Sequence, residues 1–96
     1  MTEHNSTEKF IAICVESQEL FKIKNAQYGD AIWSTGVLGA TVEIIGATAR
    51  LPQLVLRDPT HGRTNKQNLI DIFKDLHNYA IIALMMLQAN NWEGEK

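Results

Sequence analysis

Acidic side chains occur at helical spacing in two separate parts of the chain. Glu43 is the one charged residue between Asp30 and Arg50, and it lies inside the apolar run 37–47. Burying an unpaired carboxylate costs several kcal/mol of folding free energy. We therefore expect Glu43 to meet a cation, a strong hydrogen-bond donor or a metal ion.

A second acidic cluster lies in the segment 71–79. Asp71, Asp75 and Asn78 are separated by four and then three residues, and this spacing places them along one side of a helix. Oxygen atoms of carboxylates and amides are the ligands that a hard divalent ion prefers. Two helices that each offer carboxylates therefore predict a divalent-metal site, with Glu43, Asp71 and Asp75 as its candidate ligands.

Each of these residues also has a structural interpretation. Glu43 could form an ion pair with Arg50 or with a lysine. Asp71 and Asp75 could belong to a solvated helix face, since acids four residues apart are common on surfaces. Asn78 fits that interpretation less well, because Asn is a poor helix former and here precedes the most apolar part of the segment.

The apolar periodicity predicts helices and almost no strand. Asn5 followed by Glu8, and Thr64 followed by Gln67, both fit N-terminal capping boxes. Pro52 removes a backbone donor and should kink or end the second helix. The expected elements are helices at about 6–24, 36–56 and 65–89, a turn-rich loop at 25–35 with a short helical turn near Ala31, and a polar connection at 57–64.

The composition fits one small globular domain spanning residues 1–96. The chain is 45% hydrophobic and 21% charged, with a formal net charge of −2, so it lacks the basic excess typical of nucleic-acid binding. The polar N-terminal residues, together with Glu43 and Pro52 in the longest weakly polar stretch, predict neither a secretory signal nor a membrane span. Cys14 has no internal disulfide partner and fits a buried thiol in a cytoplasmic protein.

Two segments are apolar nearly all the way round: the second helix and residues 80–87 of the third. Such helices are covered on every side, and three helices of this size cannot cover one another completely. A fourth short helix or the C-terminal tail could supply the cover. We expect instead a homodimer that buries Ile82, Met85 or Met86 against a symmetry mate. The predicted fold is an all-α bundle of three to four helices completed by homo-oligomerisation, with a tail that is loose except for Trp92.

Three segments together resemble a known family. They are Lys24-Asn25-x-x-Tyr28-Gly29-Asp30-x-x-Trp33, then Glu43 with Arg50-Leu51, then Asp71-x-x-x-Asp75-x-x-Asn78-Tyr79-Ala80. This combination looks like the nucleotide modification associated domain 1 family of phages and bacteria, which is similar to the MazG-like all-α nucleoside triphosphate pyrophosphohydrolases. The likeness spans about residues 20–87.

The resemblance implies a Mg²⁺-dependent hydrolase that converts a nucleoside triphosphate, or a modified deoxynucleoside triphosphate, to the monophosphate and pyrophosphate. Magnesium suits that reaction because it neutralises phosphate charge and orients a water. The implied metal-binding and catalytic residues are Glu43, Asp71 and Asp75. The implied nucleotide contacts are Lys24, Tyr28, Trp33, Arg50 and Asn78. The two aromatic residues of this set also fit a place in the core.

The acidic motifs are shorter than the Glu-Glu-x-x-Glu and Glu-x-x-Asp motifs typical of these pyrophosphohydrolases. Val42 precedes Glu43, Gly46 lies three residues after it, and Asn78 stands where the second motif has an acid. A second interpretation is therefore a catalytically degenerate MazG-like helical protein. Such a protein would bind nucleotide or a protein partner without turnover.

Overall fold

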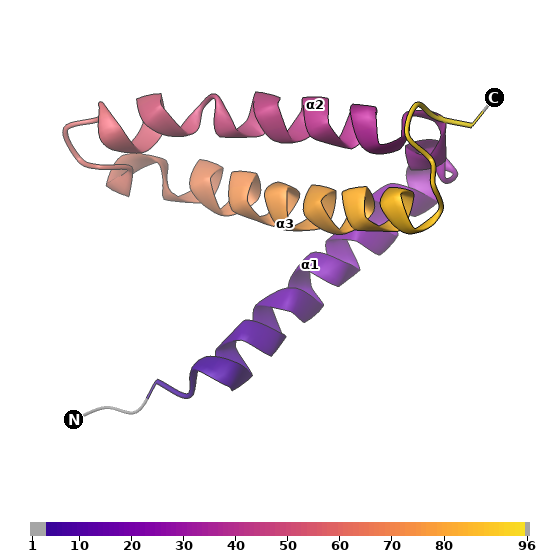
Figure 1. The fold of residues 1–96 in the computed structure, drawn as a ribbon. Helices are drawn as coiled ribbons and strands as arrows, with labels where there is room; N and C mark the ends of the chain where they lie inside the picture. The colour runs from indigo at the N-terminus through magenta and orange to yellow at the C-terminus, as the bar shows by residue number, and fades with distance from the viewer. Residues whose placement is uncertain (1–3, 96) are drawn as a thin grey trace. The chain divides into compact units, whose positions relative to one another are not determined.

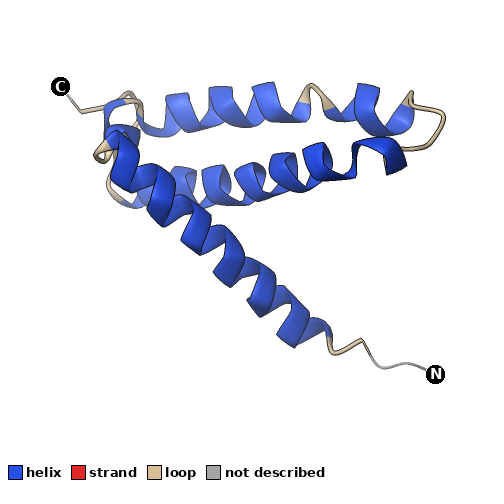
Figure 2. Cartoon of the chain, turned by 180° about the vertical axis from the view of Figure 1, so that it is seen from behind, coloured by secondary structure: helices blue, strands red, loops and turns tan. Residues whose placement is uncertain are grey.

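The computed structural model describes residues 4–95, and over this range the chain is all-helical, as predicted (Figures 1 and 2). The chain divides into two compact units, Met1–Asp30 and Ala31–Lys96. That residues 1–96 form a single domain stays a prediction. The elements in chain order are α1 (Ser6–Tyr28), the 3₁₀ helix η1 (Ala31–Ser34), α2 (Gly36–Thr48), the π-helical turn η2 (Pro52–Leu56), the 3₁₀ helix η3 (Arg63–Asn65) and α3 (Lys66–Gln88).

The predicted cap begins α1, the helix of the first unit. The side-chain oxygen of Asn5 accepts a hydrogen bond from the backbone N–H of Glu8 at 3.2 Å. This bond gives a partner to one of the N–H groups that the first turn of any helix leaves unpaired. The sequence pattern therefore located the start of this helix correctly.

The end of α1 lies beyond the predicted position near residue 24. Gly29 ends the helix in the left-handed conformation, with φ of 57°, and its N–H donates to the carbonyl of Asn25 at 2.9 Å. Glycine adopts this conformation without steric cost and is the usual residue after a helix. The turn formers after residue 24 thus form the last turn of the helix, and the loop predicted at 25–35 is confined to a short turn before the helical turn η1.

The second unit is built on α2 and α3, which lie side by side and run antiparallel (Figure 1). Its buried apolar side chains are Ala40 and Ala47 on α2 and Ile72, Ile82 and Met86 on α3. The small residues of α2 leave room for the larger ones of α3. The expectation that Ile82 or Met86 would pack against a symmetry mate is wrong, because both are buried within this chain.

Pro52 divides the predicted helix 36–56 into two pieces, visible as a break in Figure 2. The α-helix ends at Thr48, four residues before the proline. Pro52 has no N–H to donate to the carbonyl of Thr48, and its ring crowds that carbonyl. After the break the chain resumes as a π-helical turn, in which the N–H of Arg57 donates to the carbonyl of Pro52 at 2.8 Å.

Asp58 organises the connection between η2 and α3. Its carboxylate accepts hydrogen bonds from the N–H of Thr60 at 3.0 Å, from the N–H of Gly62 at 3.2 Å, and from the Thr60 hydroxyl in a shorter bond. The hydroxyl of Thr60, followed by the N–H of Gly62, lowers the pKa of Asp58 below its ordinary value of 3.8. The polar connection is therefore an ordered turn.

The prediction that a capping box of Thr64 and Gln67 begins the third helix is wrong. The chain passes through the 3₁₀ helix η3, and Asn65 precedes α3 without a side-chain capping bond. Gln67 does not reach back to Thr64, because its amide donates to Asp71 at 3.0 Å, one turn farther along α3. The helix is specified instead by its apolar periodicity.

The C-terminal tail is held to the start of α2, contrary to the prediction that only Trp92 would be ordered. Asn91 is buried, and its amide Nδ2 donates to the carbonyl of Trp33 at 2.9 Å. Its backbone carbonyl accepts from Val37 N–H and that of Trp92 accepts from Leu38 N–H, both at 3.0 Å. The tail thus supplies the acceptors for the first turn of α2, whereas the Trp92 side chain is exposed.

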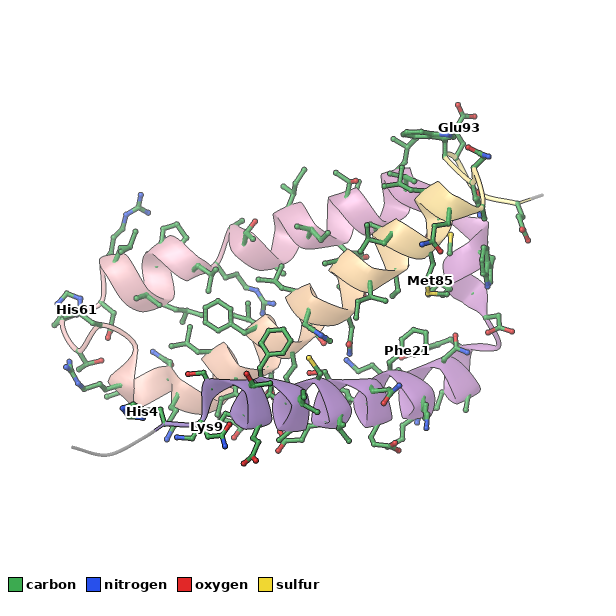
Figure 3. All side chains as sticks on the ribbon, turned by 60° about the horizontal axis from the view of Figure 1, so that its bottom comes forward. His4, Lys9, Phe21, His61, Met85 and Glu93 are labelled. Carbon is green, nitrogen blue, oxygen red and sulfur yellow. The ribbon has the colours of Figure 1, made fainter. Side chains whose placement is uncertain are left out.

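Two glycines permit this close approach. A Cβ atom on Gly36 would lie 2.7 Å from the carbonyl oxygen of Asn91 and 2.8 Å from the nitrogen of Gly94. A Cβ on Gly94 would collide with the carbonyl of Ser34. Both glycines have positive φ, 64° and 108°, so any side chain would be strained there as well as crowded. Figure 3 labels Glu93 in this tail and His61 in the connection, at opposite ends of the helical pair.

We predict that Asn91→Ala lowers the free energy of unfolding by about 1–3 kcal/mol, because it leaves the Trp33 carbonyl and the Gly94 N–H without their side-chain partners. Urea denaturation followed by far-UV circular dichroism measures the effect. Gln88→Ala, an exposed change at the end of α3, is the matched control. Equal losses in the two variants would contradict the tail's role as the cap of α2.

We also predict a pH-dependent contribution from Asp58. Its pKa is lower in the folded chain than its ordinary value of 3.8, so its charged form stabilises the fold above that pH. This stabilisation is lost as the pH falls through the lowered pKa. Thr60→Ala removes the largest cause and should move the pKa of Asp58 up towards 3.8. Titration of the Asp58 carboxyl by NMR in both proteins measures the shift, and an unchanged pKa would contradict the assignment.

Candidate functional site

A pocket of about 290 Å³ lies at the side of the α2 and α3 pair. Its walls are mostly apolar, and its polar lining residues are Thr35, Glu43 and Tyr79. The volume is at the small end of the range for ligand sites, and such a mixture of apolar walls and few polar groups is common in them. The lining residues are Ile32, Thr35, Gly39, Ala40, Val42, Glu43, Tyr79 and Ile82.

The pocket exists because small residues face it from α2. Gly39 lies one turn before Glu43, and Ala40 is buried against α3. Neither has a side chain that could fill the space. At the entrance to α2, the Thr35 hydroxyl donates to the carbonyl of Ile32 at 3.3 Å, which joins η1 to the pocket wall. The hollow is thus a consequence of local sequence at the η1–α2 junction.

Glu43 is exposed, so the expectation that its apolar neighbours bury it is wrong. Those neighbours do not cover it, because Val42 and Ile45 are themselves 67% and 62% exposed. The side chains of Glu43 and Arg50 make no hydrogen bond or ion pair within residues 4–95. Seven residues separate them, roughly 10 Å along a helix, which is too far for a direct ion pair. An ion pair among the described residues therefore does not explain Glu43.

The acidic cluster on α3 is divided between two environments. Asp71 is exposed and accepts a hydrogen bond from Gln67, whereas Asp75 and Asn78 are half-buried. The Oδ1 atom of Asn78 lies 3.0 Å from Nδ1 of His77. Asp75 stands one turn before Tyr79 on the same side of the helix, next to the pocket wall. Asp71 is one turn farther away.

The described part of the chain offers too few ligands in one place to coordinate a metal ion by itself. Nowhere in residues 4–95 do three Asp, Glu, His or Cys side chains gather in a way that could hold a metal ion. Magnesium usually takes only one or two carboxylates from the protein and completes its shell with waters and substrate phosphates. Of the three candidate ligands, only Glu43 lines the pocket; Asp75 lies one turn before the lining residue Tyr79, and Asp71 lies one turn farther away.

The remaining candidates lie around the turn after α1. Lys24 and Tyr28 belong to the last turns of α1 and are exposed. Trp33 lies in η1 and is half-buried. Its backbone carbonyl accepts hydrogen bonds from the side-chain amide of Asn91 and from the backbone N–H of Glu95. The Asn and Asp of the same motif are structural, since Asn25 Nδ2 donates to Asp30 Oδ1 at 2.7 Å.

Sequence reasoning missed two polar residues of the pocket, Thr35 and Tyr79. Tyr79 follows Asp75 by four residues and so shares its side of the helix, a spacing that was available from the sequence. No sequence spacing pointed to Thr35, because its position at the pocket depends on the path of the backbone from η1 into α2. Asn91, which holds that junction through the carbonyl of Trp33, was likewise not predicted.

Comparison of the chain with protein-family models, with curated proteins and with solved structures finds no match. In the described part of the chain, no helix has both the length and the apolar character needed to cross a membrane.

Proposed function

We propose that this protein is a Mg²⁺-dependent nucleoside triphosphate pyrophosphohydrolase, acting on a nucleoside triphosphate or a modified deoxynucleoside triphosphate in the cytoplasm. The observation that supports it is the shared pocket of α2 and α3, which Glu43 and Tyr79 line with Asp75 one turn away. The sequence likeness to the nucleotide modification associated domain 1 family points to the same chemistry.

The carboxylates have separate tasks in this proposal. Glu43 and Asp75 would hold the ion, and Asp71, the most exposed acid of the α3 cluster, would orient the attacking water. Bound magnesium would neutralise phosphate charge and fix the phosphates relative to that water. Asn78, three residues after Asp75, offers a neutral amide oxygen as a further ligand. Its contact with His77 holds that amide in place.

The reaction is a displacement at the α-phosphorus. The water oxygen forms a bond to that phosphorus while the bond from it to the α–β bridging oxygen breaks, and pyrophosphate leaves with the electron pair. The proton of the water passes to a carboxylate. Arg50 balances phosphate charge, because a guanidinium group pairs strongly with phosphate oxygens. Trp33 offers an aromatic face to the base.

The second candidate is a catalytically degenerate MazG-like helical protein that binds nucleotide or a protein partner. The exposure of Glu43 and the shortened acidic motifs favour it. Fewer carboxylates near the pocket weaken metal affinity and leave the attacking water less well oriented. In this case the pocket would retain binding without turnover.

We predict that the purified protein with Mg²⁺ releases pyrophosphate from at least one nucleotide in a panel of natural and modified triphosphates. Glu43→Gln should reduce kcat/KM at least about 100-fold, because it removes a charged metal ligand. Unchanged circular dichroism would show that the variant folds. Glu93→Gln, a change of the same chemistry on the exposed tail, should retain full activity.

Binding separates the two candidates. Mg²⁺-dependent nucleotide binding by calorimetry, without pyrophosphate release from any member of the panel, would reject the enzyme and support the degenerate binder. If the protein neither hydrolyses nor binds any nucleotide of the panel, nucleotide recognition is rejected altogether. Removal of the ion with EDTA should abolish pyrophosphate release, and added Mg²⁺ should restore it.

A further inference from the structure

The pocket at the side of α2 and α3 has an acidic end. On α2, Glu43 follows the lining residue Gly39 by one turn. On α3, Tyr79 precedes the lining residue Ile82 by about one turn. The two helices run antiparallel (Figure 1), so the later residue of α2 and the earlier residue of α3 lie toward the same end. The carboxylate of Glu43 and the ring of Tyr79 therefore share one end of the pocket.

The other end of the pocket is uncharged. It is lined by Ile82 and by Ile32, which lies in η1 just before α2. Thr35 also lines this end, but its hydroxyl already donates to the carbonyl of Ile32 at 3.3 Å. Eight residues separate Thr35 from Glu43, roughly 12 Å along a helix. The pocket is therefore long enough to separate a charged group from a hydrocarbon group.

The charge of Glu43 is not balanced at the pocket. None of the described residues that line the pocket is basic, and Glu43 makes no ion pair or hydrogen bond within residues 4–95. Apolar walls replace part of the surrounding water, so the attraction between this carboxylate and a cation is stronger than between two fully solvated charges. The same field disfavours an anion that arrives without a cation.

We infer that this pocket binds a small organic cation, a protonated amine with an unbranched hydrocarbon body. The ammonium group lies beside Glu43, and the ring of Tyr79 adds to the attraction, because aromatic rings attract ammonium groups. The hydrocarbon body lies against Ile32 and Ile82, where burial of its apolar surface contributes affinity. The pocket volume of about 290 Å³, at the small end of the range for ligand sites, suits a molecule of this size.

Amine binding has a consequence for the proposed hydrolase. The ammonium group occupies the position beside Glu43 that the proposed function gives to Mg²⁺, so the amine should inhibit pyrophosphate release, and added Mg²⁺ should relieve the inhibition. This consequence rests on the proposed function, whereas the binding of the amine does not.

An NMR titration of the full chain with three matched probes tests the binding. The probes are n-hexylammonium, n-hexanol and hexanoate, which share one hydrocarbon body and differ in charge. Hexylammonium should shift the amide signals of Gly39, Glu43 and Tyr79 and bind about fivefold or more tightly than hexanol, with hexanoate the weakest. Equal dissociation constants for the amine and the alcohol, or shifts confined to residues outside the pocket, would overturn the inference.

Removal of the carboxylate isolates its contribution. Glu43→Gln should raise the dissociation constant of hexylammonium to that of hexanol. The dissociation constant of hexanol should stay the same, because the alcohol uses only the apolar walls, and this also shows that the pocket is intact. Unchanged hexylammonium binding by Glu43→Gln would contradict the proposed position of the ammonium group.

An added cation tests the same position without changing Glu43. Val42 lines the pocket and is 67% exposed, so Val42→Lys should fold and weaken hexylammonium binding about fivefold or more by charge repulsion. Ile45→Lys is the matched control, since Ile45 is 62% exposed on the same helix but is not a lining residue. Circular dichroism checks that both variants fold. Equal losses in the two variants would show that the amine binds elsewhere and would overturn the inference.

The pyrophosphate assay separates this inference from the proposed function. Amine binding without any hydrolysis would reject the enzyme and leave the amine site standing. Hydrolysis by a protein that does not bind hexylammonium would reject only the amine site. Inhibition that added Mg²⁺ does not relieve would place the amine away from Glu43 and likewise overturn the inference.

Discussion

The hydrogen bonds of Asn91 are the interaction on which the second unit depends. Its side chain joins the end of α3 to the carbonyl of Trp33, and its backbone carbonyl accepts a hydrogen bond from the N–H of Val37 in the first turn of α2. A helix start needs acceptors for its unpaired N–H groups, and Thr35 provides no side-chain capping bond. The tail fills that need, and it does so only because Gly36 and Gly94 have no side chains to keep the two segments apart.

The pocket follows from the same junction. Once the tail fixes where η1 meets α2, Ile32 and Thr35 form one wall, and the small residues of α2 leave a hollow beside Tyr79. Glu43 is the carboxylate that this arrangement places at the pocket. Its carboxylate is exposed, as are the apolar side chains of Leu38, Val42 and Ile45 on the same helix.

Helices were predictable from the sequence because their signals are local. Asn5 with Glu8 located the start of α1, and Pro52 located the break after α2, since each acts through groups three or four residues away. The same reasoning failed for Gln67, whose amide had a competing acceptor one turn along in Asp71. For the site, spacing identified the shared side of Asp75 and Asn78, but it could not show whether Glu43 was covered.

The sequence by itself determined an all-α chain, the approximate helices, and two acidic segments on different helices. Only the tertiary structure decided that Ile82 and Met86 are internal, that Glu43 is exposed, and that the tail caps α2. The physical reason is the sequence distance over which each interaction acts. Periodicity, caps and proline act within one or two turns, whereas the bond from Asn91 to Trp33 joins residues 58 positions apart. Which distant backbone groups meet depends on how the helices pack, and no local pattern encodes that.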